Sequence, residues 1–301
     1  METIQVIVLV VAGIIGAIFG SFACCQAWRI HEKSSGKKLG KWSECMDCGA
    51  RLKWYDNLPI ISWILLRGKC RKCHKKIGLS EFLSEVLMAA AFVLIVAFYM
   101  PISVEDQIMT FDGWAVLAMV PVLIFMIPLA IMAVYDAKWG ELPVSMLTLS
   151  NILGVITFGV HEFIKLMGPC TRYGFYASKT VCYAELSEGA KWETLGGDLL
   201  SLLIAIGILA GIYFAIYMIS KEKMVGGGDY ILAAAIAVAL GSWPLAIMEL
   251  FLSNFSASIV MLPKSFKKEN RGKPFPFGPY LIISFVVVFV LQNVIRRMFI
   301  F

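Results

Sequence analysis

Charged residues are scarce in this chain, and long stretches have none. Only 16% of the 301 residues are charged and 59% are hydrophobic, whereas about 25% of a typical soluble domain is charged. The run from Thr3 to Trp28 contains no Asp, Glu, Lys or Arg, and Met1-Glu2 before it lacks the basic n-region of a secretory signal. The composition excludes an ordinary soluble protein, and we expect residues 1–28 to form a retained membrane helix.

The other apolar residues are gathered in runs of about 20, the length that a helix needs to cross a bilayer. Gly241-Ser242-Trp243-Pro244 interrupt one long run, which is either two short spans or one tilted helix with a surface segment. We predict an all-α polytopic membrane protein with about eight transmembrane helices, or seven on the second alternative. After 1–28 the runs are 82–100, 114–135, 142–164, 199–219, 230–250, 245–262 and 280–295.

Lys and Arg lie mainly on one side of the predicted membrane. Segment 29–80 carries thirteen of the 27 basic residues, whereas segment 101–113 has three acids and no base. Basic loops stay in the cytoplasm, so alternating spans also place Asp136 and Asp229 at the cytoplasmic face. The net charge of +6 follows from this topology. The predicted partner is therefore the lipid bilayer and no nucleic acid.

Four cysteines lie in a small domain, residues 29–80, between the first helix (1–28) and the remaining membrane part (81–301). They form two C-x-x-C motifs, Cys45 with Cys48 and Cys70 with Cys73, separated by 21 residues. Two such hairpins supply the four thiolates of a structural Zn²⁺ site, at a spacing just beyond the usual zinc-ribbon range. The alternative, a pair of redox motifs, lacks the βαβ context of thioredoxins. We predict a zinc-ribbon-like domain that the bound metal stabilises, because so small a domain cannot bury a large core.

The other four cysteines fall into two pairs. Cys170 and Cys182 lie in a loop predicted to be outside, where they either form a disulfide or stay free. Cys24 and Cys25 close the first span and are expected to pack as small apolar side chains.

Asp136 and Asp229 each adjoin an apolar run, where a carboxylate is costly to keep. Each alone has an ordinary explanation, as a charge at a helix end or as the N-cap of the next helix. However, both fall on the same predicted side, and Gly226, Gly227 and Gly228 before Asp229 permit close approach of a substrate backbone. Two close carboxylates share one proton, so one activates water while the other polarises a carbonyl group. We therefore predict an aspartic protease dyad.

Five motifs, in this order, resemble those of the type IV prepilin peptidases, a family of G-x-G-D aspartic proteases in bacterial membranes. The resemblance covers most of the chain. The matching residues are Gly20-Ser21-Phe22, the stretch Cys45 to Cys73 that includes Trp54-Tyr55-Asp56-Asn57-Leu58-Pro59-Ile60-Ile61-Ser62-Trp63, Asp136 with Leu142-Pro143, Gly226-Gly227-Gly228-Asp229, and Pro276-Phe277-Gly278-Pro279.

The resemblance implies an activity, cofactors and a location. Members of the family cut the basic leader from prepilins and pseudopilins at the cytoplasmic face of the inner membrane, just before a hydrophobic helix. Many then methylate the new N-terminus with S-adenosylmethionine, a step to which the stretch matching Gly68 and Lys69 is linked. Asp136 and Asp229 are then catalytic, and the residues that support the active site are Gly226, Gly228, Pro276, Phe277, Gly278 and Pro279. Glu81 and Glu85 either contact the basic leader or match a helix dipole.

Three positions depart from the family pattern. Ala23-Cys24-Cys25 replaces a Leu-Asn-Val tail, Val144 replaces an acidic or amide residue after the first motif, and Ile231 stands where a lysine is common. The last change removes a cation from the neighbourhood of the dyad. We still expect cleavage, because both aspartates and the glycines are present.

Two other classes of protein share part of the pattern. Tyr135-Asp136 with Gly226-x-Gly228-Asp229 also resembles presenilin and signal-peptide peptidase, but their P-A-L motif is absent and they have no zinc knuckles. A zinc-stapled membrane scaffold or transporter would use its aspartates to bind cations or relay protons. The sequence shows no internal repeat, which disfavours a transporter.

Overall fold

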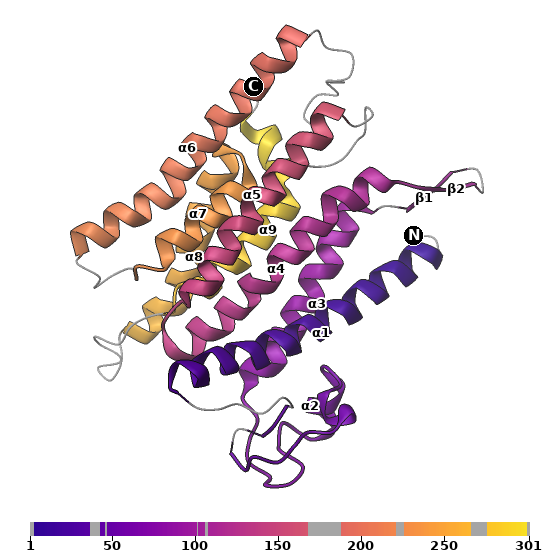
Figure 1. The fold of residues 1–301 in the computed structure, drawn as a ribbon, viewed down its shortest axis with the longest axis vertical. Coiled ribbons are helices and arrows are strands. Elements are labelled where there is room, and N and C mark those ends of the chain that lie inside the picture. Colours follow the sequence, from indigo (N-terminus) through magenta and orange to yellow (C-terminus); the bar gives the residue numbers. More distant parts are fainter. Residues whose placement is uncertain are drawn as a thin grey trace.

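The computed structural model describes residues 3–36, 43–45, 47–100, 102–105, 108–167, 188–220, 226–265 and 276–299. They form a bundle of long helices with a small domain at one end (Figure 1). The predicted alternatives for Cys170 and Cys182 concern residues outside these ranges. The elements are α1 (Thr3–Ser34), η1 (Trp54–Asn57), α2 (Ile61–Leu65), α3 (Leu79–Tyr99), β1 (Ile102–Glu105), β2 (Ile108–Phe111), α4 (Gly113–Trp139), α5 (Val144–Met167), α6 (Glu188–Ser220), α7 (Asp229–Leu240), α8 (Trp243–Ser265) and α9 (Gly278–Phe299).

The helices confirm the prediction of an all-α polytopic membrane protein. Six of the described helices, α1, α3, α4, α5, α6 and α8, are long and apolar enough to cross a membrane. Two shorter apolar helices, α7 and residues Gly278–Gln292 of α9, correspond to the remaining predicted segments. In the described part of the chain, the apolar helices thus match the eight predicted runs.

The interrupted run around Gly241 forms two helices. Gly241 adopts a left-handed conformation (φ +59°) and donates its N–H to the carbonyl of Ala237 at 3.0 Å, which ends α7, and α8 begins at Trp243. Because α7 has 12 residues and a helix rises 1.5 Å per residue, it covers about 18 Å of the roughly 30 Å hydrocarbon core. The alternative of one tilted helix with a surface segment is not observed, because α7 is buried in the bundle, with Leu232 and Ile236 fully buried.

Several element boundaries differ from the sequence prediction. Helix α1 continues to Ser34, beyond residue 28, and α6 begins at Glu188, well before residue 199. Segment 101–113, treated as a loop, contains the antiparallel pair β1 and β2, in which Ile102 pairs with Phe111 and Glu105 with Ile108. Strands of four residues lie at the lower limit of the length over which an alternating pattern identifies a strand.

Helices α4 and α7, which carry the two aspartates, are the most enclosed parts of the bundle. Helix α4 packs against α1, α3, α5 and α9, and its Phe125, Leu129 and Met132 are fully buried. Helix α7 packs between α5 and α6, and its Leu232 and Ile236 are also fully buried. Packing on several sides holds the helix ends, and therefore both aspartates, in fixed positions.

Helices α1 and α3 approach each other through glycines. A Cβ atom at Gly20, in the first motif, would lie 2.6 Å from the Cα of Glu85, and one at Gly16 would lie 2.5 Å from the carbonyl oxygen of Met88. Any larger residue at these two positions would push the helices apart. The departure at Ala23 and Cys24 is also accommodated here, since both side chains are buried and the Cys24 Sγ lies 2.9 Å from the Ser84 hydroxyl. Cys24 thus packs in the core as expected.

Candidate active site

The four cysteines of the small domain form one cluster. Their Sγ atoms all lie within 4.8 Å of one another, with Cys45 and Cys73 3.9 Å apart. This distance is far longer than a disulfide, and all four are free thiols. The arrangement brings four soft ligands to one point, as a structural metal site requires.

The backbone explains why the thiols converge. In the first hairpin Gly49 donates to the carbonyl of Cys45, and in the second His74 donates to the carbonyl of Cys70, at 2.9 and 3.0 Å. Gly49 and His74 both have positive φ, +65° and +56°. The exposed His74 therefore occupies a turn and is not part of the thiol cluster. Backbone amides of Cys73 and Lys72 lower the pKa of Cys70 to about 7, which favours the thiolate that binds metal.

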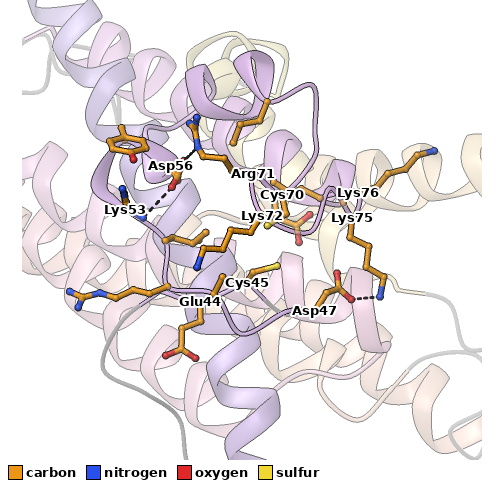
Figure 2. A pocket seen from close by; sticks show the side chains of 18 residues that line it. Glu44, Cys45, Asp47, Lys53, Asp56, Cys70, Arg71, Lys72, Lys75 and Lys76 are labelled. Carbon is orange, nitrogen blue, oxygen red and sulfur yellow. Dashed lines mark hydrogen bonds and ion pairs between the residues drawn. The ribbon is translucent and has the colours of Figure 1, made fainter.

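A cavity of about 350 Å³ lies beside the cysteine hairpins (Figure 2). Its wall includes the ion pair of Arg71 with Asp56, whose Nε and Oδ1 are 2.8 Å apart. The Arg71 guanidinium lies 5.1 Å from the centre of the Tyr55 ring. Charged side chains of both signs and one aromatic ring thus surround a space that suits a small polar ligand.

Gly68 and Lys69 do not line this cavity. Gly68 has a φ of +64°, and a Cβ atom there would lie 2.9 Å from the Trp63 ring. Lys69 forms an isolated bridge with Lys76 that begins the second hairpin. Both residues shape the turn that presents Cys70, immediately next to the cavity wall.

Glu85 joins the small domain to the membrane helices, a role that the sequence analysis missed. Its Oε2 accepts the amide of Ile60 at 2.7 Å, and its side chain also bonds Ser21 of the first motif. Ile60 has a φ of +63°, a strained conformation for a branched residue. The side chain of Glu85 is therefore engaged within the protein. Glu81 lies in the first turn of α3, where a carboxylate matches the helix dipole, and it also pairs with Lys138 of α4.

Asp136 lies in the last turn of α4 and is only 4% exposed. The N–H of Gly278, at the beginning of α9, donates to its Oδ2 at 2.7 Å. A Cβ atom at position 278 would lie 2.9 Å from the same oxygen. The fifth motif therefore meets the first aspartate through a contact that only glycine allows.

Asp229 begins α7 and is 7% exposed. Its Oδ2 accepts the N–H of Gly226 at 2.9 Å, and the N-cap position of α7 is held by Gly228. A Cβ atom at Gly228 would lie 2.7 Å from the Cβ of Leu142, so the glycine turn packs directly on the residues that follow Asp136. The N-cap explanation for Asp229 is thus wrong.

The two aspartates lie close enough to interact electrostatically. They are brought together by the end of α4 and the beginnings of α7 and α9, and the partial positive charge of helix N-termini favours carboxylates. Phe277 packs on Tyr213 of α6, with ring centroids 5.3 Å apart, and Tyr213 in turn lies 3.1 Å from the Ser253 hydroxyl. This packing holds Phe277 in place. That Pro276, Phe277, Gly278 and Pro279 support the active site, as the resemblance implies, stays a prediction.

Two positions that depart from the family pattern lie near the site. Ile231 packs against the core, and its carbonyl accepts the Asn151 side chain at 3.3 Å. Val144 begins α5 and is 75% exposed. The nearby cation of α4, Lys138, is engaged by Glu81, so within the described residues it does not replace the missing lysine.

Known proteins resemble this chain over most of its length. The Bacterial Peptidase A24 N-terminal domain matches residues 14–99. A prepilin leader peptidase/N-methyltransferase of Vibrio cholerae is 26% identical over 294 residues, which cover 95% of this chain and 97% of the relative. The enzyme of the same name from Dichelobacter nodosus is 28% identical over 85% of this chain and 73% of its own length. No solved structure matches significantly. Together with the five ordered motifs, these matches support a relationship of the chain to the type IV prepilin peptidase family.

Proposed function

We propose that this protein is a membrane aspartic endopeptidase that removes the basic leader from type IV prepilins or pseudopilins and then methylates the new N-terminus. The names of its relatives join both activities. The observation that best supports proteolysis is the meeting of Asp136 and Asp229 at three helix ends, with each carboxylate held by a glycine amide.

This geometry suits hydrolysis of a peptide bond by activated water. One carboxylate takes a proton from water as the oxygen attacks the carbonyl carbon, while the protonated partner donates to the carbonyl oxygen. Breakdown of the tetrahedral intermediate returns a proton to the leaving amine. The amides of Gly278 and Gly226 hold one oxygen of each carboxylate, which keeps the other oxygen oriented for proton transfer.

The small domain is proposed to bind a structural zinc ion and the methyl donor. Zn²⁺ would be held by Cys45, Cys48, Cys70 and Cys73, whose convergence meets the requirement for four ligands. S-adenosylmethionine supplies an electrophilic methyl group when bound. The cavity lined by Tyr55, Asp56 and Arg71 offers it charged and aromatic contacts, and Gly68 and Lys69 would position the adjoining hairpin.

We infer that the protein resides in a bacterial inner membrane with its active site on the cytoplasmic side. The dyad lies at the end of the bundle that carries the small domain, since Lys138, two residues after Asp136, pairs with Glu81 at the beginning of α3. A transporter would instead hold its functional carboxylates near the middle of the bilayer.

The test is co-expression with a prepilin encoded in the same genome, followed by intact mass measurement of the pilin. Asp136→Asn and Asp229→Asn should each abolish leader removal, whereas Asp112→Asn should retain it. Asp112 is the N-cap at the opposite end of α4, and its side chain accepts the amides of Trp114 and Ala115, a role that asparagine keeps. Processing by either dyad variant at the wild-type rate would refute the proposal.

A further inference from the structure

An apolar groove runs along the bundle between α3, α4 and α9 and has a volume of about 360 Å³. Its floor includes Met88, Met126 and Ala130, which are at least 94% buried. Its rims are formed by exposed leucines of α3 and by Ile283 and Val287 of α9. Among the described residues that line it, Ser80 and Ser84 are the only polar ones.

One end of the groove adjoins the dyad. Ala137, which follows Asp136, and Pro279, which follows Gly278, both line this end together with Ser80. Since Gly278 donates to Asp136, the groove begins where the catalytic carboxylate is held. Toward the other end its lining reaches Leu94 on α3, 14 residues from Ser80, which is about 20 Å of helix.

The position and polarity of the groove restrict what it can bind. A chain that enters the bilayer must satisfy its own backbone hydrogen bonds, which a single segment does by forming a helix. The walls offer small side chains at Ala90, Ala133 and Ala137, and small residues allow helices to approach closely in lipid. A basic segment would be excluded, because the described lining carries no charge that could pair with it.

We propose that this groove binds the hydrophobic helix that follows the scissile bond of the substrate, an inference that rests on the function proposed above. The first residues of the mature pilin then lie beside Ala137 and Pro279, with the scissile carbonyl at Asp136. The leader extends the opposite way, out of the membrane and toward the small domain. The groove thus sets the direction of the substrate and selects for an apolar segment directly after the cleavage point.

A pair of matched substitutions on α3 tests this proposal in the full-length protein. Ala90 and Ala97 are both exposed alanines two helical turns apart, but only Ala90 lines the groove. Ala90→Phe should slow processing of a co-expressed prepilin by about tenfold or more, as expected for an over-packed contact. Ala97→Phe, and Ala215→Phe at an exposed position of α6, should stay within about twofold of wild type.

A second measurement remains decisive if Ala90→Phe fails to fold. A photo-reactive p-benzoylphenylalanine at Leu87, an exposed rim residue, should cross-link to the prepilin in the Asp136→Asn background. The same probe at Leu203, an exposed leucine of α6 outside the groove, should not. Cross-links from Leu87 only to lipid or to a second copy of the chain would overturn the proposal. Equal processing by the Ala90 and Ala97 variants would do the same, whereas absence of processing by the wild type would refute the proposed function itself.

Discussion

The amide of Gly278 lies 2.7 Å from Oδ2 of Asp136, although 142 positions separate the two residues. This contact joins the end of α4 to the beginning of α9 and leaves no room for a side chain at position 278. For this reason we expect the glycine of the fifth motif to matter for the proposed chemistry of Asp136.

Gly278→Ala should therefore impair cleavage much more than stability. The added methyl group would lie 2.9 Å from the Asp136 carboxylate, so the carboxylate must move. A misplacement of about 1 Å can reduce a rate about 100-fold. The measurement is the initial rate of prepilin processing, with thermal unfolding of the purified protein as the second readout.

The control is Gly207→Ala on α6, where a Cβ atom would meet nothing within 4 Å. Alanine should leave the cleavage rate unchanged there and stabilise the helix by about 0.5–1 kcal/mol. If both alanine variants cleave at the same rate, the contact between Gly278 and Asp136 does not position the dyad.

Gly228→Ala should also reduce cleavage, for a different reason. Its Cβ would lie 2.7 Å from the Cβ and 2.9 Å from Cδ1 of Leu142, so the glycine turn and Asp229 would be displaced. Leu142→Ala removes Cδ1 and the rest of the branched end while keeping Cβ, so the double variant should recover part of the lost activity. A double-mutant cycle on the processing rate measures this coupling. Purely additive effects would show that the contact does not determine the position of Asp229.

Glu85→Ala should loosen the small domain, because it removes the acceptor for the Ile60 amide. Loss of the partner costs about 1–3 kcal/mol for a fully buried amide and less for the half-buried Ile60. We expect this loss to appear as faster limited proteolysis between residues 43 and 78. Glu85→Gln keeps a side-chain oxygen acceptor and should be close to wild type. In the alanine variant methylation should fall more than cleavage. The carboxylates of Asp136 and Asp229 are held by the amides of Gly278 and Gly226, and Glu85 does not take part in those contacts. Equal protease resistance of the two variants would exclude this anchoring role.

Metal analysis of the purified protein should give one zinc per chain. Cys45→Ser and Cys73→Ser should each reduce zinc content to near zero and raise protease sensitivity of the small domain, because small metal-stapled domains lose most of their folding energy with the metal. Cys25→Ser is the control, since Cys25 lies on α1 outside the thiol cluster. Full zinc content in the Cys45 variant would place the metal elsewhere.

Local features of the sequence predicted the helices and the cysteine hairpins well. The apolar runs predicted the membrane helices, because a helix that crosses the bilayer needs about 20 consecutive apolar residues. Each C-x-x-C motif forms its own turn, as the backbone bonds around Cys45 and Cys70 show. The break at Gly241 stayed ambiguous because both alternatives have the same composition. The contacts of Glu81 and Glu85 were missed because their partners, Lys138 and Ile60, are distant in sequence.

The sequence alone determined that the chain is a polytopic membrane protein and roughly where its apolar helices run. It also predicted Asp136, Asp229 and the four cysteines Cys45, Cys48, Cys70 and Cys73 as the residues of the two sites. Only the tertiary structure decided how these parts meet. Helix ends from three distant segments converge on the two carboxylates, and three helices enclose an apolar groove that begins beside Asp136. The physical reason is that helices and the turns of the cysteine hairpins form through contacts between residues that are close along the chain. Helix packing instead depends on close contacts, such as Gly20 on Glu85 and Gly228 on Leu142, between residues that no local pattern relates.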